Sequence, residues 1–165
     1  LAESIDRELT ELHKQGVRLN HIGRLEHLDG QLRKKILEAM ELTRNNERLA
    51  LNIAWNYGGR DEIVYAVQQI IKQGLDPEMV SEETISSHLF TSGIPDPDLV
   101  IRTSGEQRTS NFLVWQSAYA EWYFTPILWP DFDKDALSEA IKDFGRRSRR
   151  YGGRTAADEQ EKYAG

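Results

Sequence analysis

Apolar residues form two kinds of segment that alternate along the chain. Some are short continuous runs, and others are longer segments in which apolar residues recur every three or four positions. The short runs predict strands buried in a sheet, at residues 17–23, 49–55, 99–102 and 122–125. The longer segments predict helices over residues 2–14, 29–45 and 111–120, and after Gly59, Ser81 and Asp133. Strands that alternate with helices predict an α/β fold, a largely parallel β-sheet flanked by helices on both faces.

Charged and hydrogen-bonding side chains follow two of these strands at the point where each strand ends. The turn at residues 56–60, Asn-Tyr-Gly-Gly-Arg, follows the second run, and the polar segment 102–110 follows the third. Ligands of open α/β sheets bind at the carboxyl ends of the strands. The two clusters therefore predict one anion site at this edge of the sheet.

The residues after the third strand have the chemistry of a phosphate or diphosphate site. The guanidinium groups of Arg102 and Arg108 can each grip phosphate oxygens with two parallel hydrogen bonds, and Ser110 adds a hydroxyl donor. Glu106 repels phosphate, so we expect its carboxylate to orient the arginines. An ordinary Arg/Glu pair on a surface loop is the alternative for the same residues.

The composition is that of one globular domain. The chain has 165 residues, 39% of them hydrophobic and 29% charged, and no apolar run of membrane-spanning length. We expect a single α/β domain over residues 1–154 and a disordered tail over 155–165. The net charge of -6 argues against a nucleic-acid partner. The absence of cysteine excludes disulfides and thiolate metal sites and leaves the cytosol as the default compartment.

One segment carries several motifs at fixed spacing. Residues 98–132, DLVIRTSGEQRTSNFLVWQSAYAEWYFTPILWPDF, join an Arg-x-x-x-Glu-x-Arg-x-Ser pattern to an Ala-Tyr-Ala-Glu motif and a Trp-Pro pair. In this combination the segment resembles the signature region of the cis-prenyltransferases, the undecaprenyl diphosphate synthase type in particular. The turn at 56–60 and the closing segment 149–153, Arg-Arg-Tyr-Gly-Gly, are similar to further motifs of that family. The resemblance therefore spans most of the chain.

The resemblance implies an activity and a role for the cluster after the third strand. Proteins of this type condense isopentenyl diphosphate with an allylic diphosphate, use Mg²⁺ and extend a cis-polyprenyl chain into an apolar tunnel. Carried over residue by residue, Arg102, Arg108 and Ser110 would hold the isopentenyl diphosphate, and Glu106 would position them.

The resemblance also implies a metal ligand and a homodimer. Glu121 would take part in Mg²⁺ binding, although the residues alone favour a salt bridge between this carboxylate and an arginine. Arg150 and Gly152 match an Arg-x-Gly motif that reaches the site near the dimer interface. The cluster of arginines in which Arg150 lies would help to hold a diphosphate or touch an acidic membrane surface, or it complements the helix dipole.

The sequence departs from the family pattern in two places. Family members usually have Gly-Asp after the first of these strands, whereas this chain has Gly23-Arg24. The phosphate loop of the family, Asp-Gly-Asn-Gly-Arg in pattern, does not occur in the sequence. We therefore expect that roughly the first third of a family member and the first strand of its sheet are missing. No catalytic residue of the family then lies within this chain, and we expect little or no turnover from the chain alone.

Two other functions fit parts of the pattern. A non-catalytic partner subunit would lend its Arg-x-Gly tail to the site of another chain. A phosphosugar- or nucleotide-binding module would use the same arginines without prenyl chemistry. The apolar residues Leu9, Leu12 and Leu19 are candidates for a tunnel wall, and packing in the core explains them equally well.

Overall fold

The structure is a computed structural model that describes the backbone of residues 2–147 and the side chains of residues 8–147. Contacts divide the chain into two compact units, each described here by itself. The first unit comprises residues 1–95 and 111–113, and the second comprises residues 96–110 and 114–165. The single domain over residues 1–154 stays a prediction, and the tail over 155–165 lies outside the described residues.

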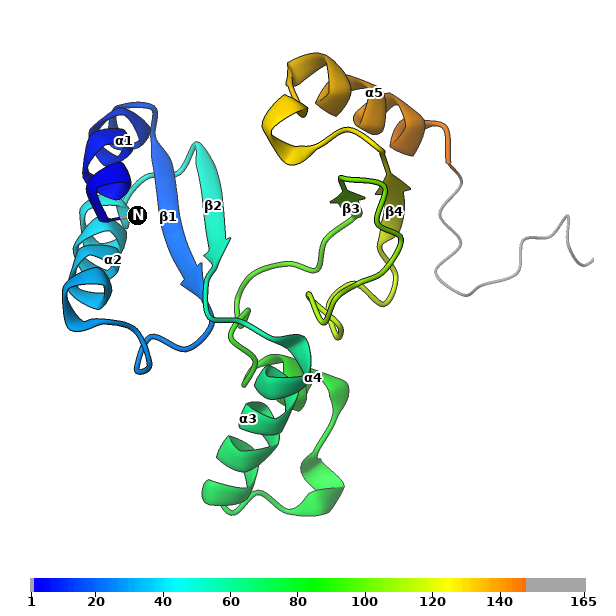
Figure 1. Ribbon diagram of the computed structural model, residues 1–165. Coiled ribbons are helices and arrows are strands. Elements are labelled where there is room, and N and C mark those ends of the chain that lie inside the picture. Colours follow the sequence, from blue (N-terminus) through cyan, green and yellow to red (C-terminus); the bar gives the residue numbers. More distant parts are fainter. Residues whose placement is uncertain (1, 148–165) are drawn as a thin grey trace, which may run out of the picture. The chain divides into compact units, whose positions relative to one another are not determined.

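Helices and strands alternate along both units, as the apolar pattern predicts (Figure 1). The first unit contains α1 (Ala2–Lys14), β1 (Val17–Ile22), α2 (Gly30–Thr43), β2 (Leu49–Ala54), α3 (Gly59–Lys72), the short helix η1 (Pro77–Met79) and α4 (Glu82–Ser86). The second unit contains β3 (Leu99–Arg102), β4 (Glu121–Phe124), the short helix η2 (Trp129–Asp131) and α5 (Lys134–Gly145). Among the helices described, none has both the length and the apolar character needed to cross a membrane.

The four strands form two separate parallel pairs. β1 pairs with β2, with Val17 beside Leu49, and β3 pairs with β4, with Leu99 beside Glu121. The α/β class with parallel strands is thereby confirmed, but the single four-stranded sheet expected from the sequence is not what the described residues form. Local apolar patterns identify a strand but do not specify its neighbours, because pairing depends on contacts between distant segments.

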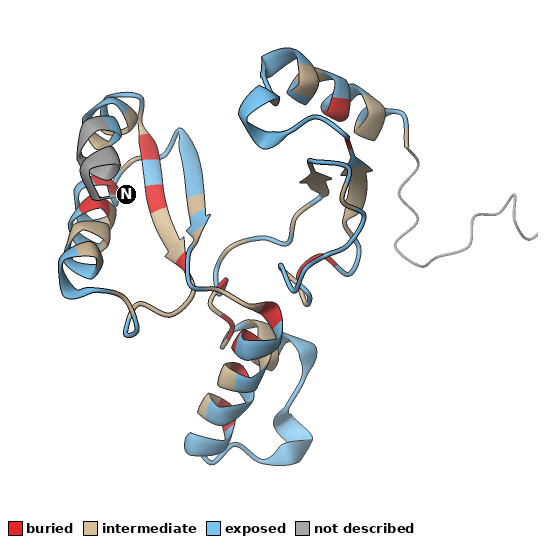
Figure 2. Cartoon of the chain, in the orientation of Figure 1, coloured by how far each residue is buried: buried red, intermediate tan, exposed pale blue. Residues whose placement is uncertain are grey.

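The core of the first unit lies between the first strand pair and two helices. β1 buries Val17 and Leu19 on the face that α1 and α2 cover, against Ala39 and the partly buried Leu9 and Leu12 (Figures 1 and 2). Each fully buried aliphatic side chain of this kind stabilises the fold by roughly 1.5–3 kcal/mol. Both α1 and α2 lie on one side of this strand pair (Figure 1).

β2 is far more exposed than its neighbour β1 (Figure 2). Leu49, Leu51 and Ile53 are 57%, 37% and 46% exposed. They lie in register with Val17, Leu19 and His21 of β1 and therefore share the apolar face of the pair. This face of β2 is covered less completely than that of β1.

A buried hydroxyl joins α2 to β1. The side chain of Thr43 is fully buried. Its Oγ1 accepts a hydrogen bond of 3.0 Å from the Leu19 backbone N–H and donates one of 2.8 Å to the carbonyl of Ala39. Both bonding capacities of the hydroxyl are therefore used where water has no access.

Glu62, in the first turn of α3, is also fully buried. Its carboxylate accepts hydrogen bonds from the Tyr57 hydroxyl and, at 3.1 Å, from the backbone N–H of Phe90. A buried carboxylate requires such donors because leaving it bare in an apolar interior is costly. Glu62 therefore fixes the β2–α3 turn to the segment that follows α4.

In the second unit, Arg147 ties the end of α5 to β4. Its guanidinium donates to Glu121 at 2.9 Å, to the Trp122 carbonyl at 2.9 Å and to Asp143 at 2.6 Å. The hydrogen bonds to Glu121 and Asp143 raise the pKa of Arg147, and the bond to Glu121 has the largest effect. The salt bridge to an arginine that the sequence favours for Glu121 is confirmed, and its partner is Arg147.

The segment over residues 111–120 is a series of turns, so the helix predicted there is wrong. Asn111 and Leu113 have φ angles of 65° and 44°, in the left-handed region. A right-handed helix cannot pass through such residues, whatever the spacing of the apolar side chains.

We expect Thr43→Val to lower the free energy of unfolding by about 1–3 kcal/mol, because the nearly isosteric valine leaves the buried N–H of Leu19 without its acceptor. Chemical denaturation measures this change. Thr10→Val is the matched control, since Thr10 is exposed on α1. Equal stabilities of the two variants would contradict the role assigned to the Thr43 hydroxyl.

Candidate functional site

The polar segment after β3 forms a loop anchored to the segment that follows β4. Arg102 is the last residue of β3. Ser104 donates its backbone N–H to the Ile127 carbonyl at 2.8 Å, and Gly105 donates to the Thr125 carbonyl at 2.9 Å. The loop from 103 to 110 therefore begins in a defined position at the carboxyl end of the strand pair.

Two of the predicted site residues meet in this loop. Arg108 and Glu106 form an ion pair of 2.5 Å, with side chains 70% and 35% exposed. Arg102 is half-buried. Glu106 thus pairs with the Nη1 of the Arg108 guanidinium, while most of the Arg108 side chain is open to solvent.

Backbone strain is concentrated at this loop. Of the five non-glycine residues with left-handed φ angles in the described chain, four lie between positions 104 and 113: Ser104, Ser110, Asn111 and Leu113. Each costs on the order of 1–3 kcal/mol and persists only where surrounding contacts enforce it, as they do most often at functional sites. Of these four residues, Ser110 is also one that the sequence selects for the site.

The residue after Ser110 caps a distant helix. The Asn111 carbonyl accepts from the Gly59 N–H at 2.7 Å, and its side-chain Oδ1 accepts from the Arg60 N–H at 2.9 Å. These two N–H groups begin α3 and have no partner within the helix. A Cβ on Gly58 would lie 2.9 Å from the Asn111 Nδ2, so the glycine there makes room for the cap. The sequence analysis missed Asn111 because the cap and the helix are 51 residues apart.

An open polar cleft of about 710 Å³ lies at the carboxyl ends of β1 and β2. Its lining includes Arg24, Asn56, Tyr57 and Asp61. Arg24 donates two parallel hydrogen bonds to Asp61, of 2.6 and 3.0 Å, and this pairing holds the pKa of Asp61 below its usual range. Arg24, which stands where family members usually have Asp, is therefore paired with a residue in the first turn of α3.

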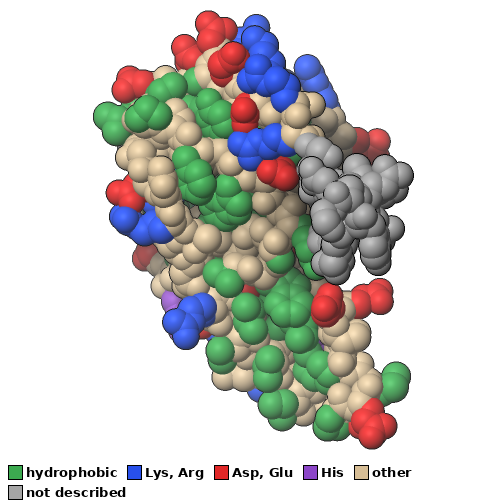
Figure 3. Space-filling view, turned by 90° about the vertical axis from the view of Figure 1, so that its right-hand side faces the viewer, with side chains coloured by type: hydrophobic (Ala, Val, Ile, Leu, Met, Phe, Trp, Pro, Cys, Tyr) green, Lys and Arg blue, Asp and Glu red, His purple; other side chains and the backbone are tan. Residues whose placement is uncertain are grey.

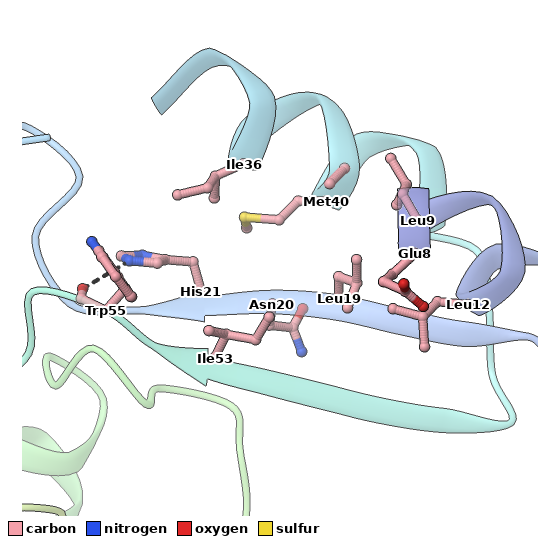
Figure 4. A pocket seen from close by; sticks show the side chains of 11 residues that line it. Glu8, Leu9, Leu12, Leu19, Asn20, His21, Ile36, Met40, Ile53 and Trp55 are labelled. Atoms are coloured by element: carbon pink, nitrogen blue, oxygen red, sulfur yellow. Dashed lines mark hydrogen bonds between the residues drawn. The ribbon is translucent and has the colours of Figure 1, made fainter. Parts of the chain in front are cut away.

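An apolar cavity of about 230 Å³ lies between the first strand pair and helices α1 and α2 (Figure 4). It exceeds the roughly 150 Å³ of a dry leucine-lined cavity that holds benzene. The three leucines that the sequence offers as a tunnel wall all line it, together with residues that the sequence reasoning did not select. The principal lining residues are Leu9, Leu12, Leu19, His21, Ile36, Met40, Ile53 and Trp55.

His21 lies in the wall of this cavity. Its Nε2 is 3.0 Å from the Trp55 carbonyl (Figure 4). Because a carbonyl only accepts, the Nε2 carries the proton. Burial lowers the pKa of His21, and the bond to Trp55 opposes this shift without cancelling it. The polar side chains of Glu8 and Asn20 also line the cavity (Figure 4).

Glu121 lies apart from the arginine loop. It begins β4 beside Leu99, whereas Arg102 ends β3 beside Phe124. Three residues along a strand separate the two positions by about 10 Å. Within the described part of the chain, no three His, Asp or Glu side chains gather in a way that could hold a metal ion. Arg150 and Gly152 lie outside the described residues.

Comparison with known proteins shows what the chain is similar to. Residues 1–152 match the family model described as putative undecaprenyl diphosphate synthase. An isoprenyl transferase of Heliobacterium mobile is 49% identical over 157 residues, which cover 93% of this chain and 60% of that protein. A ditrans,polycis-undecaprenyl-diphosphate synthase of Vibrio vulnificus, named as specific for (2E,6E)-farnesyl diphosphate, is 47% identical, covering 90% of this chain and 61% of its own length.

Solved structures agree with the sequence relatives. Lavandulyl diphosphate synthase from Lavandula x intermedia, in complex with dimethylallyl diphosphate, superposes with a TM-score of 0.87 at 35% identity, covering 92% of this chain and 67% of that one. A probable undecaprenyl diphosphate synthase from Campylobacter jejuni gives 0.82 at 37% identity, covering 91% and 70%. The chain spans about three fifths of the length of the curated relatives it matches and belongs to the undecaprenyl diphosphate synthase family of cis-prenyltransferases.

Proposed function

We propose that this chain forms the isopentenyl-diphosphate-binding part of a cis-prenyltransferase, which joins isopentenyl diphosphate to an allylic diphosphate and lengthens a cis-polyprenyl chain of the undecaprenyl type. The observation that carries this proposal is the loop after β3, which presents Arg102, the Glu106–Arg108 pair and Ser110. Family membership supplies the reaction, and the chemistry of these side chains matches one of its substrates.

The loop suits a diphosphate better than a single carboxylate. A guanidinium binds two phosphate oxygens at once, so Arg102 and Arg108 together can meet both phosphate groups. Ser110 adds a hydroxyl donor, and Glu106 restrains Arg108 before the ligand arrives. Such restraint lowers the entropy that is lost when the side chain binds its ligand.

The reaction itself forms one carbon–carbon bond and releases one diphosphate. The terminal alkene carbon of isopentenyl diphosphate bonds to C1 of the allylic partner, the C1–O bond to diphosphate breaks, and a proton leaves C2 of the isopentenyl group. In our proposal the residues of this chain hold the nucleophile by its diphosphate and contribute orientation to the reaction.

The apolar cavity of the first unit is our candidate for contact with the growing prenyl chain. Most of its lining is aliphatic or aromatic, and Glu8, Asn20 and His21 are its polar members. Burial of a hydrocarbon chain there is favourable by about 0.8 kcal/mol for each methylene group. Two relatives are named for allylic ligands of this kind, farnesyl and dimethylallyl diphosphate.

We propose that Mg²⁺ reaches this chain together with the diphosphate. Mg²⁺ is usually bound by substrate phosphates, waters and one or two carboxylates. Glu121, the carboxylate that the resemblance assigns, is bonded to Arg147 and lies at the other end of the strand pair from Arg102. These residues do not fit a metal site shared with the arginine loop within one described chain, so no step here runs through the metal. Glu121 as a ligand stays a prediction.

A homodimer in which Arg150 and Gly152 reach the site also belongs to this proposal. In its support, the second unit exposes large apolar side chains, among them Trp129 at 74%, and Figure 3 shows hydrophobic side chains open to solvent on one face. Exposed apolar surface is typical of contact sites. A cytosolic location, contact with a membrane surface and the lack of a nucleic-acid partner stay predictions.

We expect Arg102→Ala to weaken binding of isopentenyl diphosphate about 100-fold, because a bidentate, charge-assisted contact is lost. Isothermal titration calorimetry measures the Kd. Arg33→Ala is the control, because Arg33 is exposed on α2 and belongs to no candidate site, and its Kd should equal that of the unchanged chain. Binding of a nucleotide in place of isopentenyl diphosphate, or an unaltered Kd in Arg102→Ala, would falsify the proposed function.

We expect Leu9→Trp to weaken binding of farnesyl diphosphate about tenfold, because the indole occupies the cavity and excludes two or more methylene groups of the ligand. Displacement of an apolar fluorescent dye measures this affinity, and the Kd for isopentenyl diphosphate should not change. Val64→Trp, at an exposed position of α3, is the matched control. If Leu9→Trp and Val64→Trp bind farnesyl diphosphate equally well, the cavity does not hold the prenyl chain.

A third experiment decides the role of Glu121. If Mg²⁺ binds through the diphosphate alone, added Mg²⁺ should tighten binding of isopentenyl diphosphate by the same factor in Glu121→Gln as in the unchanged chain. Glu121→Gln should instead lower the stability, because Arg147 loses its charged partner. Calorimetry with and without Mg²⁺ gives the first quantity and chemical denaturation the second. Loss of the Mg²⁺ effect in Glu121→Gln would identify this carboxylate as a metal ligand.

A further inference from the structure

We infer that Asn111 is a positioning residue for isopentenyl diphosphate, because its bonds to the first turn of α3 restrain the residue next to Ser110. The inference rests on the proposed function and deepens it. Asn111 is not expected to touch the ligand, and it acts through Ser110, to which it is joined by one peptide bond.

The contacts that fix Asn111 are made by both its backbone and its side chain. Its carbonyl accepts from Gly59 at 2.7 Å, and its Oδ1 accepts from Arg60 at 2.9 Å. Its Nδ2 would be 2.9 Å from a Cβ on Gly58, and the neighbouring Phe112 packs edge-to-face on Tyr57, with ring centroids 5.8 Å apart. By its contacts Asn111 therefore belongs with the first unit.

This fixed point limits where the Ser110 hydroxyl can lie. Consecutive Cα atoms are about 3.8 Å apart, so Ser110 cannot move far from a restrained Asn111. Ser110 and Asn111 both have left-handed φ angles, 49° and 65°, which aim the backbone in a direction that a relaxed chain avoids. The loop is thus held at one end by the bonds of Ser104 and Gly105 and at the other by Asn111.

Asparagine suits this position better than other residues. It tolerates the left-handed region, and its amide supplies the acceptor that the start of a helix requires. The glycine at position 58, the cap residue of α3, is explained by this close approach of Asn111. The turn at 56–60 is therefore hydrogen-bonded to the residue that follows Ser110 in the chain.

The experiment compares the Kd for isopentenyl diphosphate across five variants of this chain. Asn111→Ala removes the side-chain cap. Gly58→Ala adds a methyl group that displaces the Asn111 amide, while the amino acids at position 111 and in the loop stay the same. We expect each to raise the Kd about tenfold, as Ser110→Ala does by removing the hydroxyl. If Asn111 acts through Ser110, the double variant Ser110→Ala/Asn111→Ala should bind no more weakly than Ser110→Ala alone.

Asn46→Ala is the matched control, since Asn46 also bridges backbone segments by its amide, donating to the Val17 carbonyl at 2.8 Å, but lies outside the loop. Its Kd should not change. Unaltered binding in both Asn111→Ala and Gly58→Ala, or effects of Ser110 and Asn111 that multiply, would overturn the inference while the proposed function stands. If the unchanged chain does not bind isopentenyl diphosphate, the proposed function fails and the inference fails with it. Gly58→Ala keeps the test decisive where Asn111→Ala does not fold.

Discussion

The first backbone N–H groups of a helix need acceptors from outside the helix, and α3 obtains two of them from Asn111. By its contacts Asn111 belongs with the first unit, as do Phe112 and Leu113, whereas Ser110 before it belongs to the second. That contact needs the space left by Gly58, which has no side chain, and the left-handed backbone of Ser110 and Asn111. The strain of the arginine loop is thus offset by hydrogen bonds made elsewhere in the chain.

Three other polar side chains that are buried or half-buried also depend on hydrogen bonds to distant parts of the chain. Thr43, Glu62 and Arg147 each join segments that are distant in sequence, and each uses a hydrogen bond to a backbone group to do so. A polar group that is withdrawn from water stabilises the fold only when its bonds are made, and it then fixes one arrangement of its neighbours. These contacts hold the elements that carry the candidate site.

Local patterns in the sequence were sufficient for most elements but not for their pairing. The third strand is found at the predicted residues, and Leu9, Leu12 and Leu19 line one cavity, because apolar spacing reports which side of an element is buried. The same spacing fails over 111–120, where left-handed residues interrupt the chain. Neither the division of the strands into two pairs nor the cap by Asn111 has a local signal, because both depend on contacts between distant residues.

The exposed face of β2 has a consequence for experiments in concentrated solution. The strand presents alternating Leu49, Leu51 and Ile53 to solvent and carries no charged residue over its six positions. An uncharged apolar strand at the edge of a sheet is a template on which another chain can add a strand of its own. We therefore expect self-association by strand addition to increase with protein concentration, and a lysine substituted on that strand to reduce it.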